Sequence, residues 1–179
     1  MLGRARAAAE KLLARNVEVF ERLGYQPTDR SRPLEARLER ERGPALHLRM
    51  APKGRIFGGA YALELAPAEP PLPKTGGLAG RPRGVVRLER VAFRARRGDE
   101  AGAHLARRIE RDEAVQRALA LVHFERVRVD AEGRPVIRHM GGSLVWILFP
   151  PLVRPVPLDD EQARASVAAL DALAAVARS

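Results

Sequence analysis

The chain has 179 residues, of which 46% are hydrophobic and only 4% aromatic, and its formal net charge is +10. This length suffices for one domain whose core is built mostly from aliphatic side chains. The sequence contains no cysteine, which excludes disulfides, thiolate metal sites and cysteine nucleophiles. The strongly positive charge raises the question of polyanionic partners.

The basic residues are almost all arginine, because lysine occurs only at Lys11, Lys53 and Lys74. Together with abundant alanine, glycine and proline, this bias is typical of a GC-rich genome, including those of thermophiles. The bias explains the choice of arginine over lysine but not the excess of bases over acids. Part of the positive charge therefore has no compositional explanation.

No segment has the pattern of an export signal or of a membrane span. The first 25 residues carry Glu10, Lys11 and Arg15 where a signal peptide needs an uncharged apolar stretch. A spanning helix needs about eighteen consecutive apolar residues, and the sequence holds no such run. These observations predict a soluble, cytoplasmic protein with no membrane span.

Three helices are predicted along the chain. The first covers 4–23, with Gly24 suited to its left-handed C-terminal cap. The second covers 99–121, in two pieces around Asp112. The last covers about 160–178, with Asp159 as its N-cap and Gln162 closing a capping box.

Strand-like patterns alternate with these helices, and Gly58-Gly59 inside one of them indicates a bulge or a close backbone approach. The segment 66–84 is rich in proline and glycine and is predicted to be a flexible loop. The predicted strands are 34–42, 45–50, 55–65, 85–96, 121–129, 134–140 and 143–149.

The order of these elements predicts a single α+β domain spanning 1–179. Its core would be a curved antiparallel sheet of about seven strands, with the long N- and C-terminal helices packed on one face. Segments 34–50 and 124–140 are equally long, and each precedes a Gly-Gly strand, which suggests an internal α-β-β-β duplication. The strand 143–149 is apolar on both faces, as expected for a covered central strand or for a strand against a partner chain in a homodimer.

A hairpin around residues 130–133 carries candidate catalytic residues. A turn there would place Asp130 opposite Arg134 and Glu125 opposite His139, with His123 diagonal on the same face. Two imidazoles and a carboxylate could bind a metal ion or act as an acid–base pair, so a metal-assisted hydrolase is one interpretation. The same face carries aliphatic residues, so the pair is equally readable as a half-buried structural contact, and no metal site is assigned.

The leading functional hypothesis is non-covalent binding of a small apolar or amphipathic ligand between sheet and helix, with residues 74–84 as a candidate lid. The pocket walls would be Phe57, Tyr61, Leu144, Trp146 and Leu148.

The alternative hypothesis is a nucleic-acid-binding module that uses an arginine-rich strand, because phosphate contacts supply most non-specific affinity. Binders of single strands usually add aromatic stacking platforms, whereas only Phe93 is interleaved here. The sequence identifies neither a cofactor nor a reaction. The arginines concerned are Arg81, Arg83, Arg87, Arg90, Arg94, Arg96 and Arg97.

Overall fold

A computed structural model describes residues 2–55, 58–83, 90–147 and 152–178. Within these ranges the chain forms four α-helices, one short 3-10 helix and ten strands, which confirms the predicted α+β class. The helices are α1 (Leu2–Glu21), α2 (Glu100–Arg111), α3 (Glu113–Ala120), α4 (Asp160–Ala175) and the 3-10 helix η1 (Val176–Arg178). The strands are β1 (Gln26–Asp29), β2 (Glu35–Glu39), β3 (Leu46–Arg55), β4 (Gly58–Pro67), β5 (Leu78–Arg83), β6 (Arg90–Ala95), β7 (Phe124–Val129), β8 (Pro135–His139), β9 (Ser143–Ile147) and β10 (Leu152–Val156).

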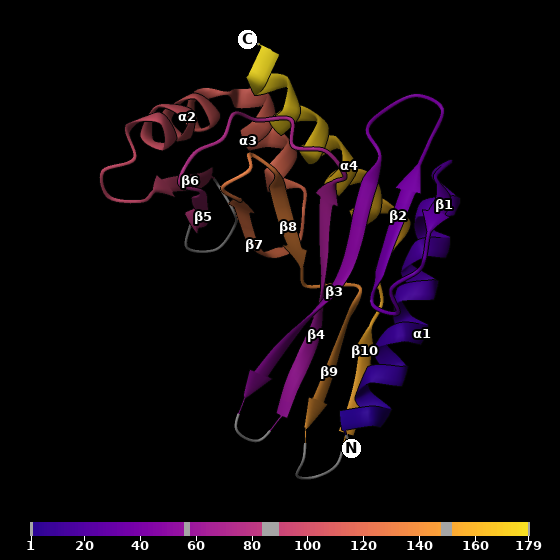
Figure 1. Ribbon diagram of the computed structural model, residues 1–179. Helices are drawn as coiled ribbons and strands as arrows, with labels where there is room; N and C mark the ends of the chain where they lie inside the picture. The colour runs from indigo at the N-terminus through magenta and orange to yellow at the C-terminus, as the bar shows by residue number, and fades with distance from the viewer. Residues whose placement is uncertain (1, 56–57, 84–89, 148–151, 179) are drawn as a thin grey trace.

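All of these strands belong to one antiparallel sheet with the order β1-β2-β3-β4-β8-β7-β5-β6, and β9 and β10 are attached beside β4. The end of β4 at Glu64 and Leu65 pairs with β8, whereas its beginning at 58–61 pairs with β9. Strands β3 and β4 therefore continue beyond the main body and form an arm with β9 and β10, and α1 runs alongside this arm (Figure 1).

Strands β8 and β9 follow each other along β4 and are separated by a bend at Gly142, which has a φ of 68°. A Cβ there would lie 2.6 Å from Cδ2 of Leu63. The Asn16 amide Nδ2 donates to the Gly142 carbonyl at 2.9 Å and holds the bend against α1. In a strict repeat of the first half, β8 and β9 would pair with each other as β3 and β4 do, and they do not.

Alternating side chains give the sheet two different sides. On β4, Leu63 and Leu65 are fully buried in a core to which all four helices contribute, and we call this the helix side. Glu64 points to the opposite side, here called the open side, as do its partners Arg49 on β3 and Arg138 on β8. The open side carries most of the charged residues of the strands.

Aspartates begin three of the helices, as capping rules predict. Asp112 ends α2 and caps α3 through Oδ1, which accepts from the backbone N–H of Val115, so the predicted break is confirmed. Asp159 caps α4, but Gln162 closes no capping box. Instead, the Gln162 side chain accepts from the His123 backbone N–H and donates to the Leu121 carbonyl, which ties α4 to the segment before β7.

Three strands were not predicted: β1, β5 and β10. Each contains a proline, and β5 occupies 78–83, so the prediction of a flexible loop over 66–84 is wrong for these residues. Proline has no N–H to donate and is found on edge strands with its nitrogen facing away from the ladder. Pro27 and Pro155 lie in β1 and β10, two of the strands at which the sheet ends.

The third terminal strand, β6, is covered by side chains. The backbone N–H of Val91 donates to Gln116 Oε1 at 2.8 Å, and the Gln116 amide returns a hydrogen bond to the Val91 carbonyl at 3.2 Å. The N–H of Phe93 donates to Glu110 Oε1 at 2.6 Å. Residues of α2 and α3 thereby take the place of a further strand.

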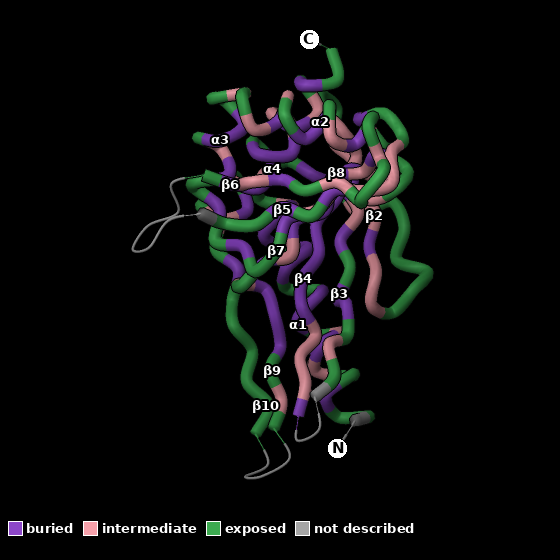
Figure 2. Tube along the Cα trace, turned by 90° about the vertical axis from the view of Figure 1, so that its left-hand side faces the viewer, coloured by how far each residue is buried: buried purple, intermediate pink, exposed green. Residues whose placement is uncertain are grey.

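Within the predicted strand 143–149, the described residues 143–147 form β9, which is not covered on both sides. Strand β9 lies between β4 and β10, and Val145 and Ile147 on its open side are 39% and 37% exposed. Every residue of β10 is exposed, and Figure 2 shows this part of the arm in the colour of exposed residues. None of the helices in the described ranges is long and apolar enough to cross a membrane.

Candidate functional site

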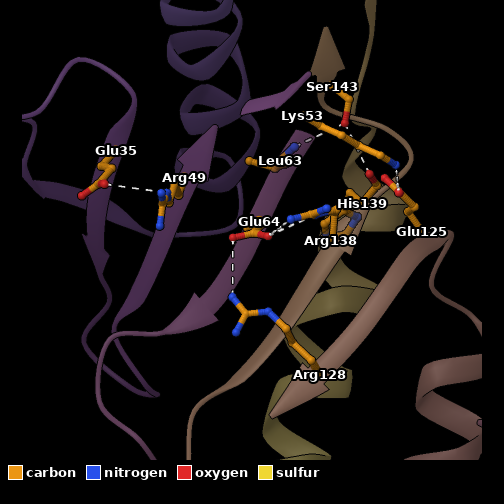
Figure 3. Close-up of polar contacts among 10 residues, drawn as sticks. All are labelled: Glu35, Arg49, Lys53, Leu63, Glu64, Glu125, Arg128, Arg138, His139 and Ser143. Carbon is orange, nitrogen blue, oxygen red and sulfur yellow. Dashed lines mark hydrogen bonds and ion pairs between the residues drawn. The ribbon is translucent and has the colours of Figure 1, made fainter. Parts of the chain in front are cut away.

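One half of the open side has its charges paired, and Glu64 is at its centre. This carboxylate is only 7% exposed, and its Oε1 accepts from Arg138 Nε and Nη2 at 3.0 and 2.6 Å. Arg128 Nη2 lies 3.8 Å from the other oxygen (Figure 3). Glu64 thus brings an acidic group between two guanidinium groups, and the contact with Arg138 is a charge-assisted hydrogen bond.

The neighbouring charges of β2 and β3 are paired as well. Glu35 lies 3.9 Å from Arg49 and 3.5 Å from His47, whose pKa is lowered chiefly by burial. Arg37 donates to Glu39 at 3.0 Å on the same strand. We call this region of β2, β3, β4 and β8 the paired half.

The other half of the open side, on β5, β6 and β7, contains a hollow of about 450 Å³. Strand register places Arg128 of β7, Ala79 of β5 and Arg94 of β6 opposite one another across the sheet. Because Ala79 has only a methyl group, the space between the two arginines is left open. This arginine hollow is lined by Gly76, Gly77, Leu78, Ala79, Arg94, Ala95, Arg96, Arg126, Arg128, Val129, Asp130 and Ala131.

Three of the four arginines that line this hollow have no ion pair with a described residue, whereas the fourth, Arg128, lies 3.8 Å from Glu64. Arg94, Arg96 and Arg126 are exposed, and none of them has an ion pair with a described residue. Asp130 at the rim accepts the backbone N–H of Arg134 at 2.8 Å and contributes one negative charge. Several uncompensated guanidinium groups around one hollow produce a local positive potential.

In the adjoining glycine segment, two backbone N–H groups are already hydrogen-bonded within the protein and are not free to bind an anion. The N–H of Gly76 donates to Asp99 Oδ2 at 2.7 Å, and that of Gly77 donates to Thr75 Oγ1 at 3.1 Å. Recognition of an anion in the hollow would therefore depend mainly on guanidinium groups, which suit phosphate oxygens in charge and geometry.

The arginines predicted to bind nucleic acid do not all lie at the hollow. Arg94 and Arg96 line the hollow, and Arg81 follows Gly80 on the open side of β5. Arg90 pairs with Glu113 instead. Arg97 is exposed in the turn after β6. The side chains of Arg83 and Arg87 lie outside the described part of the chain.

Sequence reasoning missed Arg126 and Arg128. Both belong to β7, which the pairing of Ala79 with Arg128 brings beside β5. The alternation Arg126-Val127-Arg128 was visible as a local signal, since it places two arginines on one side of a strand. Nothing local, however, indicated which strand would lie next to them.

Three of the five residues predicted to wall an apolar pocket lie on the helix side. Leu144 is a core residue, while Tyr61 and Trp146 are half-buried on the same side of the arm. The Trp146 ring covers Gly59, where a Cβ would lie 2.7 Å from Cζ2, so the predicted close approach at this glycine is confirmed. Two predicted residues, Phe57 and Leu148, lie outside the described residues.

The hairpin register was predicted correctly at its turn and wrongly at its open end. The N–H of Asp130 donates to the Arg134 carbonyl at 2.9 Å, as expected. A bulge at Glu125 then shifts the register, so that Phe124 faces His139. Glu125 is exposed and forms an ion pair with Lys53 of β3 (Figure 3).

His139 is buried on the helix side with 1% exposure, and neither ring nitrogen has a hydrogen-bond partner in the structure described. Burial lowers the pKa of His139 to about 4, so the ring is neutral near pH 7. His123 is exposed and lines a cavity of about 240 Å³ together with His139. Among the described residues, no three His, Cys, Asp or Glu side chains cluster as a metal site would require.

Comparison with known proteins identifies the family of the chain. No curated protein and no solved structure matches the chain. Residues 20–177 match the family described as "Protein of unknown function (DUF3156)", a range that includes every strand and the helices α2, α3 and α4. The chain therefore belongs to the DUF3156 family.

Proposed function

We propose that the protein binds nucleic acid through phosphate contacts in the arginine hollow. The observation that carries this proposal is the group Arg94, Arg96 and Arg126, which is exposed around one hollow and forms no ion pair with a described residue. Other arginines of the same sheet side are neutralised by Glu64, Glu35 and Glu39. The charge excess of the chain is thus concentrated where a polyanion could reach it.

Such binding would depend steeply on salt. Each phosphate neutralised by an arginine releases condensed counterions, so the logarithm of the binding constant falls by about 0.9 per contact for each unit of log salt concentration. The guanidinium groups have no base-reading partners fixed beside them in the hollow. Affinity would therefore come mainly from phosphates, with little dependence on base sequence.

Fluorescence anisotropy with labelled DNA, in both duplex and single-stranded form, tests the proposal at several salt concentrations. The double variant Arg94→Gln/Arg126→Gln should weaken binding at least about tenfold and reduce the salt slope by about two. The control is Arg37→Gln, which removes one charge from the paired half of the same side. If neither form of DNA binds at low salt, or if the control weakens binding as much as the double variant, the proposal is wrong.

The second candidate function is binding of a small apolar or amphipathic ligand, and one observation favours it. A groove of about 420 Å³ runs between α1 and residues 155–158, with Leu12, Val19 and Leu158 among its lining. An amphipathic molecule could place its polar end near Arg15 or Arg22, which line the same groove. Native mass spectrometry of the purified protein tests this, because a retained ligand adds mass that Val19→Asp should abolish.

A further inference from the structure

We infer that the nucleic acid taken by the arginine hollow is a duplex, with one row of arginines on each of its two phosphate backbones. This inference rests on the proposed function and specifies its ligand. It is carried by two independent observations: where the aromatic side chains lie, and how the arginines of the hollow are spaced.

Aromatic side chains are placed where bases cannot stack on them. Phe93 and Phe124, on the same strands as the arginines, are buried on the helix side at 4% and 7% exposure. Tyr61 and Trp146 also point to the helix side, and Phe20 and Tyr25 are fully buried. Binding of single strands normally combines a basic groove with aromatic platforms that stack successive bases. Within the described residues, the arginine hollow offers the first of these and not the second.

The arginines form two rows, in which three of the four stand on paired strands and Arg96 follows the last residue of β6. Arg94 and Arg96 extend from the end of β6, and Arg126 and Arg128 lie on β7, with β5 between them. Two interstrand spacings separate the rows by about 10 Å at the backbone, and successive arginines within a row are about 6.7 Å apart. Ala79 on β5 leaves the space between the rows open.

This spacing suits a ligand with two backbones. The grooves of B-form DNA are about 6 and 12 Å wide, so their flanking phosphates lie within reach of arginine side chains from rows about 10 Å apart. A single strand presents one backbone, and it could occupy one row fully but not both. Glu64 marks the border of the contact. It binds Arg138 and also lies 3.8 Å from Arg128, so within the row on β7 it is Arg126 that has no ion pair with a described residue.

The experiment compares a short DNA duplex with one of its separated strands, at equal salt and with the folded protein. We expect the duplex to bind at least about tenfold more tightly. Equal or tighter binding of the single strand would overturn the inference while leaving the proposed function standing. Absence of binding to both probes would remove both.

Variants that delete one row at a time give a sharper test. Arg94→Gln/Arg96→Gln and Arg126→Gln/Arg128→Gln should each bring the duplex affinity down to about that of the single strand. Arg37→Gln/Arg49→Gln carries the same charge change in the paired half and should leave the preference for duplex unchanged. Circular dichroism confirms that each variant is folded. A row variant that weakens both probes equally and keeps the preference would contradict the two-row arrangement.

Discussion

The two halves of the open side use the same residue type in different ways. In the paired half, two nitrogens of Arg138 donate to one oxygen of Glu64, whose carboxylate is almost completely buried. These hydrogen bonds connect β8 to β4. In the arginine hollow, Arg94 and Arg126 are exposed and have no acidic partner in the part of the chain described. Arginine is thus a structural residue at one end of the sheet and an unsatisfied cation at the other.

The difference shows that net charge alone says little about a binding surface. Cations near a buried acid are neutralised and desolvated, whereas clustered cations without acids repel one another and attract polyanions. A fold gains no stability from such a cluster. The binding role proposed for the hollow would account for such a cluster.

The largest expected loss of stability comes from a glycine in the β7–β8 turn, close to the hollow but not part of its lining. Gly133→Ala introduces a Cβ 2.0 Å from the Leu72 carbonyl oxygen, at a φ of 89°, and should destabilise the protein by at least about 3 kcal/mol. Gly133 bonds Leu72 through its own carbonyl, so the segment leading to the hollow should detach first. Urea denaturation measures the change. Gly98→Ala, with a φ of 84° and no atom within 4 Å of the added Cβ, is the matched control and should cost only about 1 kcal/mol. Equal losses for the two variants would contradict the predicted clash.

The second test separates the stability that the core loses at low pH from the stability that the paired half loses. His139 follows Arg138 on β8 but is buried, with a pKa of about 4 instead of 6.5. The unfolded chain then binds more protons between these values, so stability is retained above pH 6.5 and falls by about 3 kcal/mol as the pH drops to 4. His139→Leu should remove this loss, which denaturation midpoints at pH 7 and pH 4.5 would reveal. An unchanged pH slope in the variant would show that carboxylates alone cause acid unfolding.

A somewhat smaller loss of stability is expected when the central carboxylate of the paired half is removed. Glu64→Gln leaves Arg138 without its carboxylate in a half-buried position and should destabilise the protein by about 2 kcal/mol. The same substitution should strengthen DNA binding, because it makes the paired half resemble the arginine hollow. Denaturation and anisotropy measured on one preparation test both expectations. A variant with unchanged stability would mean that Glu64 is not a structural anchor.

The smallest effect concerns the hollow itself. Arg94→Gln should leave stability within about 0.5 kcal/mol, or raise it slightly at low salt, because it relieves repulsion among exposed cations. High salt should cancel any gain, since screening already weakens the repulsion. Thermal unfolding at two salt concentrations measures this. A clear destabilisation would show that Arg94 has a structural role like that of Arg138.

Local patterns predicted the helices well and the strands in part. Asp112 and Asp159 marked helix starts because capping is decided within one turn of the chain. Strands β1, β5 and β10 were missed because their prolines resemble loop signals, although proline is tolerated where an N–H need not reach a neighbour. Register failed at Glu125 because a bulge depends on contacts outside the hairpin, here with Lys53.

The sequence predicted only the arginines of the candidate site that lie on or beside the β5–β6 pair. The arginine run around Arg94 was visible in the sequence, and its position across β5 from Arg128 depends on β5 pairing with β7 across more than forty residues. Which arginines are neutralised depends likewise on long-range pairs such as Glu64 with Arg138, separated by 74 residues. Neither kind of contact leaves a local trace in sequence.

If the proposed function holds and several copies bind one nucleic acid, the way the sheet ends has a consequence for their packing. Many copies on one nucleic acid would experience a local concentration far above that in solution, and exposed strand edges at such density are templates for fibril growth. Pro27 and Pro155 remove donors from two terminal strands, and Gln116 occupies the third. Copies crowded side by side would therefore be kept from joining their sheets, so a dense array could dissolve again when the polymer leaves.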